Sequence, residues 1–167
     1  MKTDKIILDA CCGGRMFWFD KNNPLALFVD IRKGEYELCD GRKFTVSPDM
    51  VADFRNLPFD DGQFSLVVFD PPHLLKIGGS SWMAQKYGAL DKDHWQEDIK
   101  RGFDECMRVL KPNGTLVFKW NERDIRLSEL LKVIGREPLF GHTTTKSRNT
   151  TYWMCYLKMT EDVQSGI

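Results

Sequence analysis

The sequence predicts a single α/β domain built on a mostly parallel β-sheet. Short apolar runs of strand length recur along the chain, and stretches with helical spacing of apolar residues lie between later runs, as in parallel sheets. The 167 residues are 42% hydrophobic, which suffices for one buried core and is too apolar for a disordered chain. The 24 basic residues balance the 24 acidic ones, which argues against a protein that binds nucleic acid by charge alone.

The first half of the chain contains four expected strands, which are apolar runs of strand length that end in or run directly into an acid. They are Lys5–Ala10, Leu25–Asp30, Val51–Asp53 and Phe64–Phe69. Between the first two, the segment Arg15–Asn22 is short and aromatic, so we expect a stubby, well-packed crossover helix there. Residues 32–45 are polar and contain glycines, which predicts a loop or a small hairpin.

The second half begins where Asp70-Pro71-Pro72-His73 takes the chain out of the sheet, because two prolines cannot continue a central strand. From Asp91, a candidate N-cap, apolar residues recur at helical spacing as far as Leu110, and Lys111–Gly114 ends that helix. The remaining expected elements are a strand at Thr115–Trp120, a short helix at Ser128–Ile134 capped by Gly135, and a strand at Tyr152–Leu157.

Residues 1–160 are expected to form the one domain, and residues 161–167 a disordered tail. No apolar run approaches the roughly 18 residues of a membrane span, so we expect a cytoplasmic protein that does not bind membranes. The five cysteines are odd in number and include no C-x-x-C, so neither a disulfide framework nor a metal site is expected.

The candidate chemistry lies where the strands end. Asp9, Asp30 and Asp70 end three strands, and Asp53 ends a fourth, so these acids should meet at one edge of a parallel sheet. Ligands of open α/β sheets bind at that edge. The turn after Asp9 contains Gly13 and Gly14 but neither G-x-G-x-x-G nor G-K-[ST], so a ligand with ribose hydroxyls and no phosphate cradle is favoured.

Several segments resemble class I S-adenosylmethionine-dependent methyltransferases, and the likeness covers nearly the whole chain. Asp9-x-Cys11-x-Gly13 is similar to the family's acid and glycine turn, although Cys11 stands where a glycine is usual. Ala52–Phe64 is similar to its D-x-x-x-L-P-F-x-D-x-x-F segment, and Met107–Gly114 resembles its R-x-L-K-P-G-G helix end. The resemblance implies a Rossmann-like seven-stranded sheet of order 3-2-1-4-5-7-6, with the last strand antiparallel and helices on both faces.

The same resemblance implies S-adenosylmethionine as the cofactor. Asp30 matches the acid that holds both ribose hydroxyls, Ile31 the apolar residue that packs on adenine, and Asp53 the acid that binds the adenine amino group. The residues expected to bind the cofactor are Asp9, Cys11, Gly13, Asp30, Ile31, Asp53, Phe54 and Asp70. A second departure from the family lies in the glycine turn, where Arg15 replaces another usual glycine.

Asp70-Pro71-Pro72-His73 resembles the [DN]-P-P-[YFW] motif of amino-methyltransferases that act on adenine N6, cytosine N4 or an amide nitrogen. The Asp70 carboxylate and the Pro71 carbonyl can each accept one N–H of an exocyclic amine and aim its lone pair at a methyl group. The prolines fix φ near −65°, which presents that carbonyl without a conformational search. His73 replaces the aromatic residue that stacks on the target base.

Three further residues are candidates for contacting the substrate. Trp82 and Tyr87 follow a Gly-Gly-Ser-Ser stretch, which is the composition of a lid over residues 74–88, although packing of the loop explains them equally well. Lys119 follows the apolar part of a strand and could contact phosphate, or it could belong to a solvated basic rim.

We therefore expect methyl transfer from S-adenosylmethionine to an exocyclic amino nitrogen, adenine N6 or cytosine N4 of RNA or DNA. Two alternatives remain open at this point. The same fold could methylate a protein glutamine or a small amine, or it could be a non-catalytic, cofactor-binding partner subunit. The oligomeric state is not indicated by any pattern in the sequence.

Overall fold

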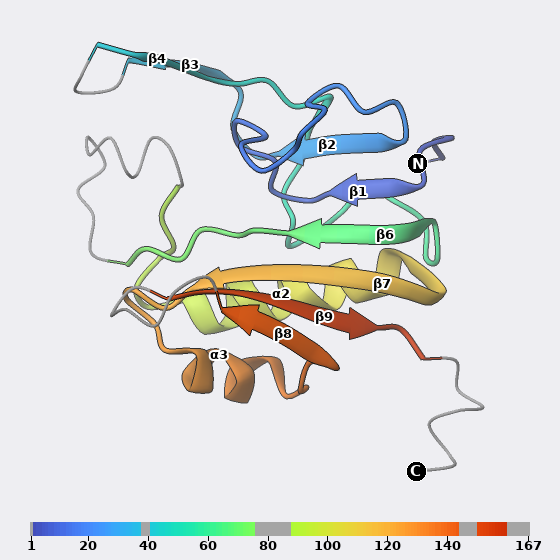
Figure 1. Ribbon diagram of the computed structural model, residues 1–167, viewed down its shortest axis with the longest axis vertical. Helices are drawn as coiled ribbons and strands as arrows, with labels where there is room; N and C mark the ends of the chain where they lie inside the picture. The colour runs from blue at the N-terminus through green and yellow to red at the C-terminus, as the bar shows by residue number, and fades with distance from the viewer. Residues whose placement is uncertain (1, 38–40, 76–87, 144–149, 160–167) are drawn as a thin grey trace.

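The computed structural model describes residues 2–37, 41–75, 88–143 and 150–159. Its main element is a seven-stranded sheet with the order β5-β2-β1-β6-β7-β9-β8 (Figure 1). The strands are β1 (Ile7–Asp9), β2 (Ala26–Asp30), β5 (Met50–Val51), β6 (Phe64–Phe69), β7 (Leu110–Asn121), β8 (Phe140–Thr143) and β9 (Thr151–Leu157). In chain order this is 3-2-1-4-5-7-6, and β9 runs antiparallel to both of its neighbours, so the predicted topology is confirmed.

The central strands are parallel and buried, which explains their continuous apolar sequences. β1 pairs in parallel with β2 on one side and with β6 on the other, and β6 pairs in parallel with β7. Leu8, Val67 and Phe118 on these strands are fully buried. The carboxyl ends of β1, β2 and β6 all point to the left in Figure 1, which brings their terminal acids to one edge of the sheet.

Helix α2 (Trp95–Val109) packs against β6 and β7 through buried apolar residues at helical spacing, including Ile99 and Phe103. The predicted start at Asp91 is wrong. The Asp91 carboxylate accepts the backbone N–H of Asp93 and contacts the His94 ring, so it stabilises a turn before the helix. Gly62 and Gln63 donate backbone hydrogen bonds to the last carbonyls of the helix, and the chain enters β7 directly.

Helix α3 (Leu127–Ile134) contacts α2 and shares its hydrophobic core, so both lie on the same face of the sheet. Its predicted cap is confirmed. Gly135 has φ 69° and donates its backbone N–H to the carbonyl of Leu131, a left-handed conformation that glycine adopts at little cost. Neither described helix is long and apolar enough to cross a membrane.

The segment between β1 and β2 differs from the short crossover helix that the sequence predicts there. Arg15–Asn22 forms a series of turns and bends instead of a short helix. Its aromatic side chains pack on the sheet: the Trp18 ring lies 4.9 Å edge-on from Phe28, and the Phe17 ring 5.4 Å edge-on from Trp153. Packing of these large rings over so few residues decides the local backbone, which overrides the helical tendency of the segment.

Residues 34–37 and 43–46 pair with each other as in a small hairpin, which is one of the two structures that the sequence predicts for this region. Its strands, β3 (Gly34–Glu37) and β4 (Lys43–Val46), are antiparallel and make a separate sheet that projects from the body of the molecule (Figure 1). The Phe44 ring anchors the hairpin, because it lies 2.5 Å from where a Cβ of Gly14 would stand. A residue larger than glycine at position 14 would therefore displace Phe44.

Candidate active site

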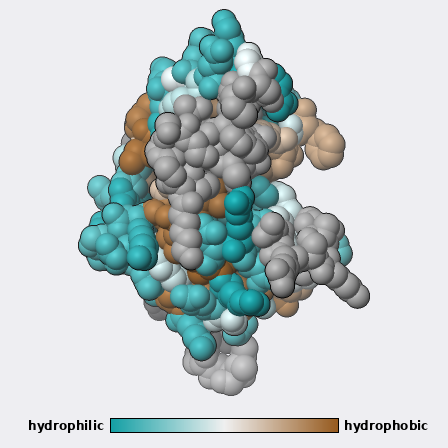
Figure 2. Space-filling model, turned by 90° about the vertical axis from the view of Figure 1, so that its left-hand side faces the viewer, coloured by the Kyte–Doolittle hydropathy of each residue, from teal (hydrophilic) through white to brown (hydrophobic). Residues whose placement is uncertain are grey.

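A pocket opens at the edge where β1, β2 and β6 end. The space between its lining atoms is about 610 Å³, open solvent at its mouth included. Figure 2 views the molecule from this edge, where apolar surface shows between hydrophilic side chains. The pocket is lined by Ala10, Cys11, Cys12, Gly13, Gly14, Met16, Phe17, Asp30, Ile31, Arg32, Phe54, Asp70, Pro71, Pro72 and His73.

The turn after β1 forms one wall of the pocket and is tied to β2. Gly13 has φ 49° and donates its backbone N–H to the Asp30 carboxylate over 2.9 Å. The Cys12 N–H bonds the carbonyl of Val29 at 2.8 Å, so the turn continues the sheet hydrogen bonding beyond the strand. Cys11 lines the pocket, and burial raises the pKa of its thiol, which keeps it neutral.

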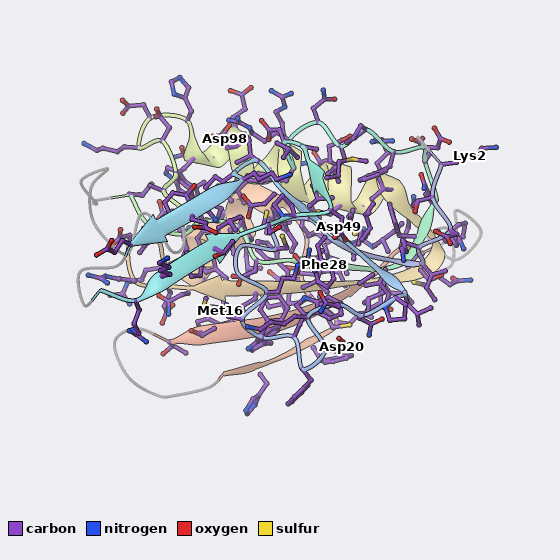
Figure 3. All side chains as sticks on the ribbon, turned by 90° about the horizontal axis from the view of Figure 1, so that it is seen from above. Lys2, Met16, Asp20, Phe28, Asp49 and Asp98 are labelled. Carbon is purple, nitrogen blue, oxygen red and sulfur yellow. The ribbon has the colours of Figure 1, made fainter. Side chains whose placement is uncertain are left out.

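Arg15 takes the place of a usual glycine and also adopts a left-handed φ of 53°. This conformation costs free energy for a residue with a side chain. The guanidinium lies 3.8 Å over the Phe28 ring and 3.0 Å from the Asp49 carboxylate, and it also donates to the carbonyls of Lys21 and Ser47. Figure 3 labels Phe28 and Asp49, which lie close together. These contacts stabilise the turn despite its backbone strain.

Asp30 stands at the centre of the pocket wall and is almost fully buried. Its Oδ1 accepts the backbone N–H of Arg32 at 2.9 Å and the Nε of the same residue at 3.1 Å. Its Oδ2 accepts the N–H of Gly13. The carboxylate is therefore fixed by backbone donors, and the Arg32 side chain covers it from the pocket side. The pairing of Arg32 with Asp30 was not predicted from the sequence. A basic residue two positions after an acid that ends a strand is a pattern that could have indicated this pair.

Asp9 is not among the residues that line the pocket. It is completely buried, and its Oδ2 accepts the indole N–H of Trp18 at 2.7 Å. Burial raises the pKa of Asp9 to about 7, while the hydrogen bonds from Trp18 and the backbone of Cys11 act in the opposite direction. Asp9 therefore binds the turn segment to the strand end.

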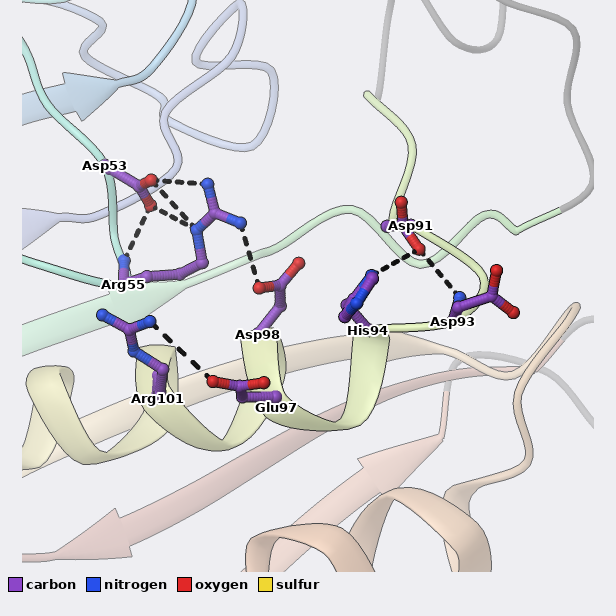
Figure 4. A network of polar contacts seen from close by, with 8 residues as sticks. All are labelled: Asp53, Arg55, Asp91, Asp93, His94, Glu97, Asp98 and Arg101. Carbon is purple, nitrogen blue, oxygen red and sulfur yellow. Dashed lines mark hydrogen bonds and ion pairs between the residues drawn. The ribbon is translucent and has the colours of Figure 1, made fainter.

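Asp53 does not line the pocket either, and Figure 4 shows the contacts that hold it. The Arg55 side chain donates to both of its oxygens at 2.6–2.9 Å and reaches Asp98 on α2 with its other nitrogen at 2.9 Å. The neighbouring Phe54 does line the pocket. Its ring fills the space in which a side chain at Gly102 would stand, 2.5 Å from that Cβ position.

The Asp70-Pro71-Pro72-His73 segment, which follows β6, lines the same pocket as the glycine turn. The Asp70 Oδ2 lies 2.6 Å from the Nζ of Lys119 on β7. Burial raises the pKa of Asp70, and the Lys119 ammonium opposes that rise. Ile31 completes the lining on the β2 side and is half exposed.

His73 lines the pocket at the end of this segment and also contacts the core. Its ring lies edge-on to the buried Trp120 ring, with centroids 6.3 Å apart. Burial and the nearby Lys119 lower its pKa to about 4, although a hydrogen bond with the Pro71 backbone acts in the opposite direction. His73 is therefore neutral at physiological pH, and its imidazole supports the Pro71 peptide.

Two of the predicted substrate residues, Trp82 and Tyr87, and most of the predicted lid lie outside the described residues. Lys119 contacts Asp70 and the rings of Phe17 and Trp153. The sequence did not indicate that Phe17, Trp18 or Trp153 would lie beside the site, because each comes from a segment far from Asp70 in the chain. Within the described ranges, no cluster of three or more histidine, cysteine or acidic side chains could hold a metal ion.

Comparison with protein-family models and with curated proteins finds no match for this chain. Among solved structures, a SAM-dependent methyltransferase from Methanosarcina mazei aligns with 96% of this chain and 95% of its own, with TM-score 0.55 and 13% identity. The N-methyltransferase NodS from Bradyrhizobium japonicum aligns with 93% of this chain and 86% of its own, with TM-score 0.55 and 12% identity.

A third solved structure is the 1,6-didemethyltoxoflavin-N1-methyltransferase of Burkholderia thailandensis, with bound 1,6-didemethyltoxoflavin and S-adenosylhomocysteine. It covers 92% of this chain and 71% of its own, with TM-score 0.53 and 13% identity. The chain therefore has the Rossmann-like fold of S-adenosylmethionine-dependent methyltransferases.

Proposed function

We propose that this protein transfers a methyl group from S-adenosylmethionine to an exocyclic amino nitrogen, namely adenine N6 or cytosine N4 of RNA or DNA. The observation that carries the proposal is the position of Asp70 and Pro71, which line the same pocket as Gly13 and Asp30. One wall thus offers a buried carboxylate beside a glycine turn, and the other offers acceptors for an amine. The fold and the three structural neighbours support this assignment.

The pocket residues fit the proposed cofactor. The Asp30 carboxylate can accept both hydroxyls of a ribose once the Arg32 side chain moves from Oδ1, and the Gly13 N–H keeps the carboxylate in place meanwhile. Ile31 and Phe54 supply apolar surface for an adenine ring. When bound, S-adenosylmethionine supplies an electrophilic methyl group on its sulfonium.

Asp70 and Pro71 supply what an amine needs to act as a nucleophile. The lone pair of an exocyclic amine is delocalised into its ring, so hydrogen bonds that pyramidalise the nitrogen expose that lone pair. A carboxylate acceptor also stabilises the positive charge that develops on nitrogen. The prolines hold the Pro71 carbonyl in place, and the His73 ring contacts that backbone from the core side.

The names of two structural neighbours support nitrogen as the acceptor atom. NodS is described as an N-methyltransferase, and the Burkholderia thailandensis enzyme methylates N1 of its substrate according to its name. A nucleic acid as the substrate rests on the likeness of Asp70-Pro71-Pro72-His73 to the amino-methyltransferase motif.

The test is methylation of defined pools with deuterium-labelled S-adenosylmethionine. Total RNA, genomic DNA, a peptide pool and small amines are incubated separately with the protein, and the products are identified by mass spectrometry. We expect labelled N6-methyladenine or N4-methylcytosine in one nucleic-acid pool and its loss in Asp70→Ala. Asp104→Ala, which changes an exposed acid on α2, is the matched control and should keep full activity.

Label only in peptide glutamine or in a small amine would contradict the nucleic-acid substrate but would still agree with methyl transfer to a nitrogen. Label on carbon or oxygen would contradict the proposed reaction. Binding of S-adenosylmethionine in calorimetry without label in any pool would favour the non-catalytic, cofactor-binding alternative, and absence of binding would contradict both this alternative and the proposed methyl transfer.

A further inference from the structure

Lys119 and Asp70 form a pair that joins two strands far apart in the chain. Phe69 on β6 is in register with Phe118 on β7, so the next residue on each strand brings Asp70 beside Lys119. Their Oδ2 and Nζ atoms lie 2.6 Å apart, and the side chains are 17% and 20% exposed respectively. In a pair this short and this shielded from water, each charge acts more strongly on the other than in a surface ion pair, because less water screens them.

Two aromatic rings confine the Lys119 ammonium. Its Nζ lies 5.5 Å from the centroid of Phe17 and 5.7 Å from that of Trp153, distances typical of cation–π contacts. The two rings pack edge-on against each other, and Trp153 is held beside Lys119 by the β7–β9 register. These two ring contacts hold the ammonium beside Asp70, whereas a lysine that bound a nucleic-acid phosphate would extend into solvent.

The pair occupies only one oxygen of the carboxylate. In the parts of the chain that the structure describes, Lys119 is the only hydrogen-bond partner of Asp70, and it contacts Oδ2. Oδ1 is left for a ligand, and Asp70 lines the pocket. One oxygen of the carboxylate therefore binds the Lys119 ammonium, and the other can accept an N–H of the substrate.

We propose that Lys119 is a positioning residue, which holds one oxygen of Asp70 and thereby keeps the carboxylate ionised and its other oxygen directed to the acceptor amine. This inference rests on the proposed amine methylation for its chemical purpose. The effect of the Lys119 ammonium on the protonation of Asp70 can be tested without any substrate.

The surroundings explain why Asp70 needs this cation. Burial raises the pKa of Asp70, and the facing Asp9 carboxyl and Cys11 thiol provide no positive charge to oppose it. His73 is neutral because its pKa is lowered to about 4, and Asp124 and Arg123 act on His73 with opposite signs. Among the groups that act on Asp70 itself, Lys119 alone lowers its pKa. Removal of the ammonium should therefore protonate Asp70 at a higher pH.

Carbon-13 NMR of the Asp70 side-chain carboxyl, assigned with Asp70→Asn, measures this directly in the full chain. We expect the protonation midpoint to rise by about one pH unit or more in Lys119→Met, because an opposite charge within hydrogen-bond distance has an effect of this size. Lys119→Arg should stay near the wild-type midpoint. Lys100→Met, which removes an exposed lysine on α2, is the matched control and should leave the midpoint unchanged.

The wild-type protein provides a second measurement that needs no substitution at Lys119. The nitrogen-15 shift of its ammonium should change at the pH where Asp70 takes up a proton. An Asp70 midpoint that is the same in Lys119→Met as in the wild type overturns the proposal. So does a Lys119 shift that is insensitive to Asp70 protonation, and this result is readable even where Lys119→Met does not fold.

Methyl transfer supplies the activity readout. At neutral pH, turnover in Lys119→Met should fall about tenfold or more and recover toward alkaline pH, with cofactor affinity unchanged and with partial rescue by Lys119→Arg. A higher KM for nucleic acid with an unchanged pH profile would contradict positioning and indicate a phosphate contact. If the wild type methylates no amine, the proposed function fails, whereas the NMR titrations still decide whether Lys119 controls Asp70.

Discussion

Asp30 and Asp70 end strands at the same edge of the sheet and line the same pocket, yet they are held in opposite ways. Asp30 accepts two backbone N–H groups, and its cation, Arg32, comes from two residues along the chain. Asp70 has no backbone donor among the described residues, and its cation, Lys119, comes from another strand. Asp30 is thus fixed by its own turn, and Asp70 by the tertiary structure.

The two arrangements suit two different roles, ligand binding and participation in the reaction. A carboxylate that binds a neutral diol must stay in place while its cation leaves, and the backbone donors of Asp30 allow the Arg32 side chain to move. A carboxylate that takes part in chemistry needs one oxygen open and its charge maintained, and the confined ammonium of Lys119 does both for Asp70. The following predictions would break or sharpen this comparison.

The largest effect is expected at Asp70. Asp70→Ala should lower turnover by a factor on the order of 10²–10⁴, the range observed when one preorganised acceptor is lost. Cofactor affinity should change little, because the lost contact is with the amine that accepts the methyl group and not with the cofactor. Single-turnover methylation and calorimetry measure the two quantities. In Asp70→Asn, partial activity would mean that hydrogen bonding dominates, and wild-type turnover in both variants would rule out the assigned chemistry.

A third acid at the same edge, Asp9, should make the free energy of unfolding depend on pH. Its pKa is raised to about 7 from 3.8, so the unfolded state loses this proton first as pH rises. The free energy of unfolding should therefore decrease between about pH 4 and pH 7, by on the order of 3–4 kcal/mol for this group. Urea denaturation at pH 5 and pH 8 covers about 2–3 kcal/mol of this decrease, and the difference between the two pH values should be smaller by about that amount in Asp9→Asn. An identical pH dependence in both proteins would show that Asp9 is ionised when buried.

At Asp30 the effect should be on binding. Asp30→Ala should weaken S-adenosylmethionine binding by about 2 kcal/mol, because two charge-assisted hydrogen bonds to the ribose are lost. The fold should remain, since Cys12 still bonds β2 through its backbone. Titration calorimetry with circular dichroism as the folding control tests this. Wild-type affinity in a folded variant would mean that Asp30 does not bind the ribose.

The smallest effect is expected at Asp53. Its carboxylate is bound by Arg55 and does not line the pocket, so Asp53→Asn should change cofactor affinity by less than about threefold. The partly exposed ion pair should contribute under about 1 kcal/mol to stability. A tenfold loss of cofactor affinity would instead support the adenine-binding role that the family resemblance implies.

The fold and part of the pocket were predictable because their signals are local. Apolar runs that end in acids located β1, β2 and β6, and parallel strands then had to bring Asp30 and Asp70 to one edge. The edge strand β8 was missed, since Phe140 is exposed and follows no alternating pattern. The helix predicted over Arg15–Asn22 was wrong because contacts with distant residues decide that segment.

The partners of the acids were the least predictable part of the site. Trp18 binds Asp9, Arg55 binds Asp53 and Lys119 binds Asp70, and only the second pair is close enough in sequence to be guessed. From its charge alone, Lys119 is predicted either to contact phosphate or to belong to a solvated basic rim, and neither interpretation includes Asp70. Its register opposite Trp153 depends on an antiparallel pairing that the apolar run of β9 does not specify.

The most direct test of the account is a crystal structure of the wild-type protein with S-adenosylhomocysteine. We predict that both ribose hydroxyls lie within hydrogen-bond distance of Asp30, that the Arg32 Nε has left that carboxylate, and that the Lys119–Asp70 pair is unchanged. The ligand sulfur should face Asp70 and Pro71. A ligand bound outside this pocket, or bound with Arg32 still on Asp30 and the Lys119–Asp70 pair broken, would contradict the account.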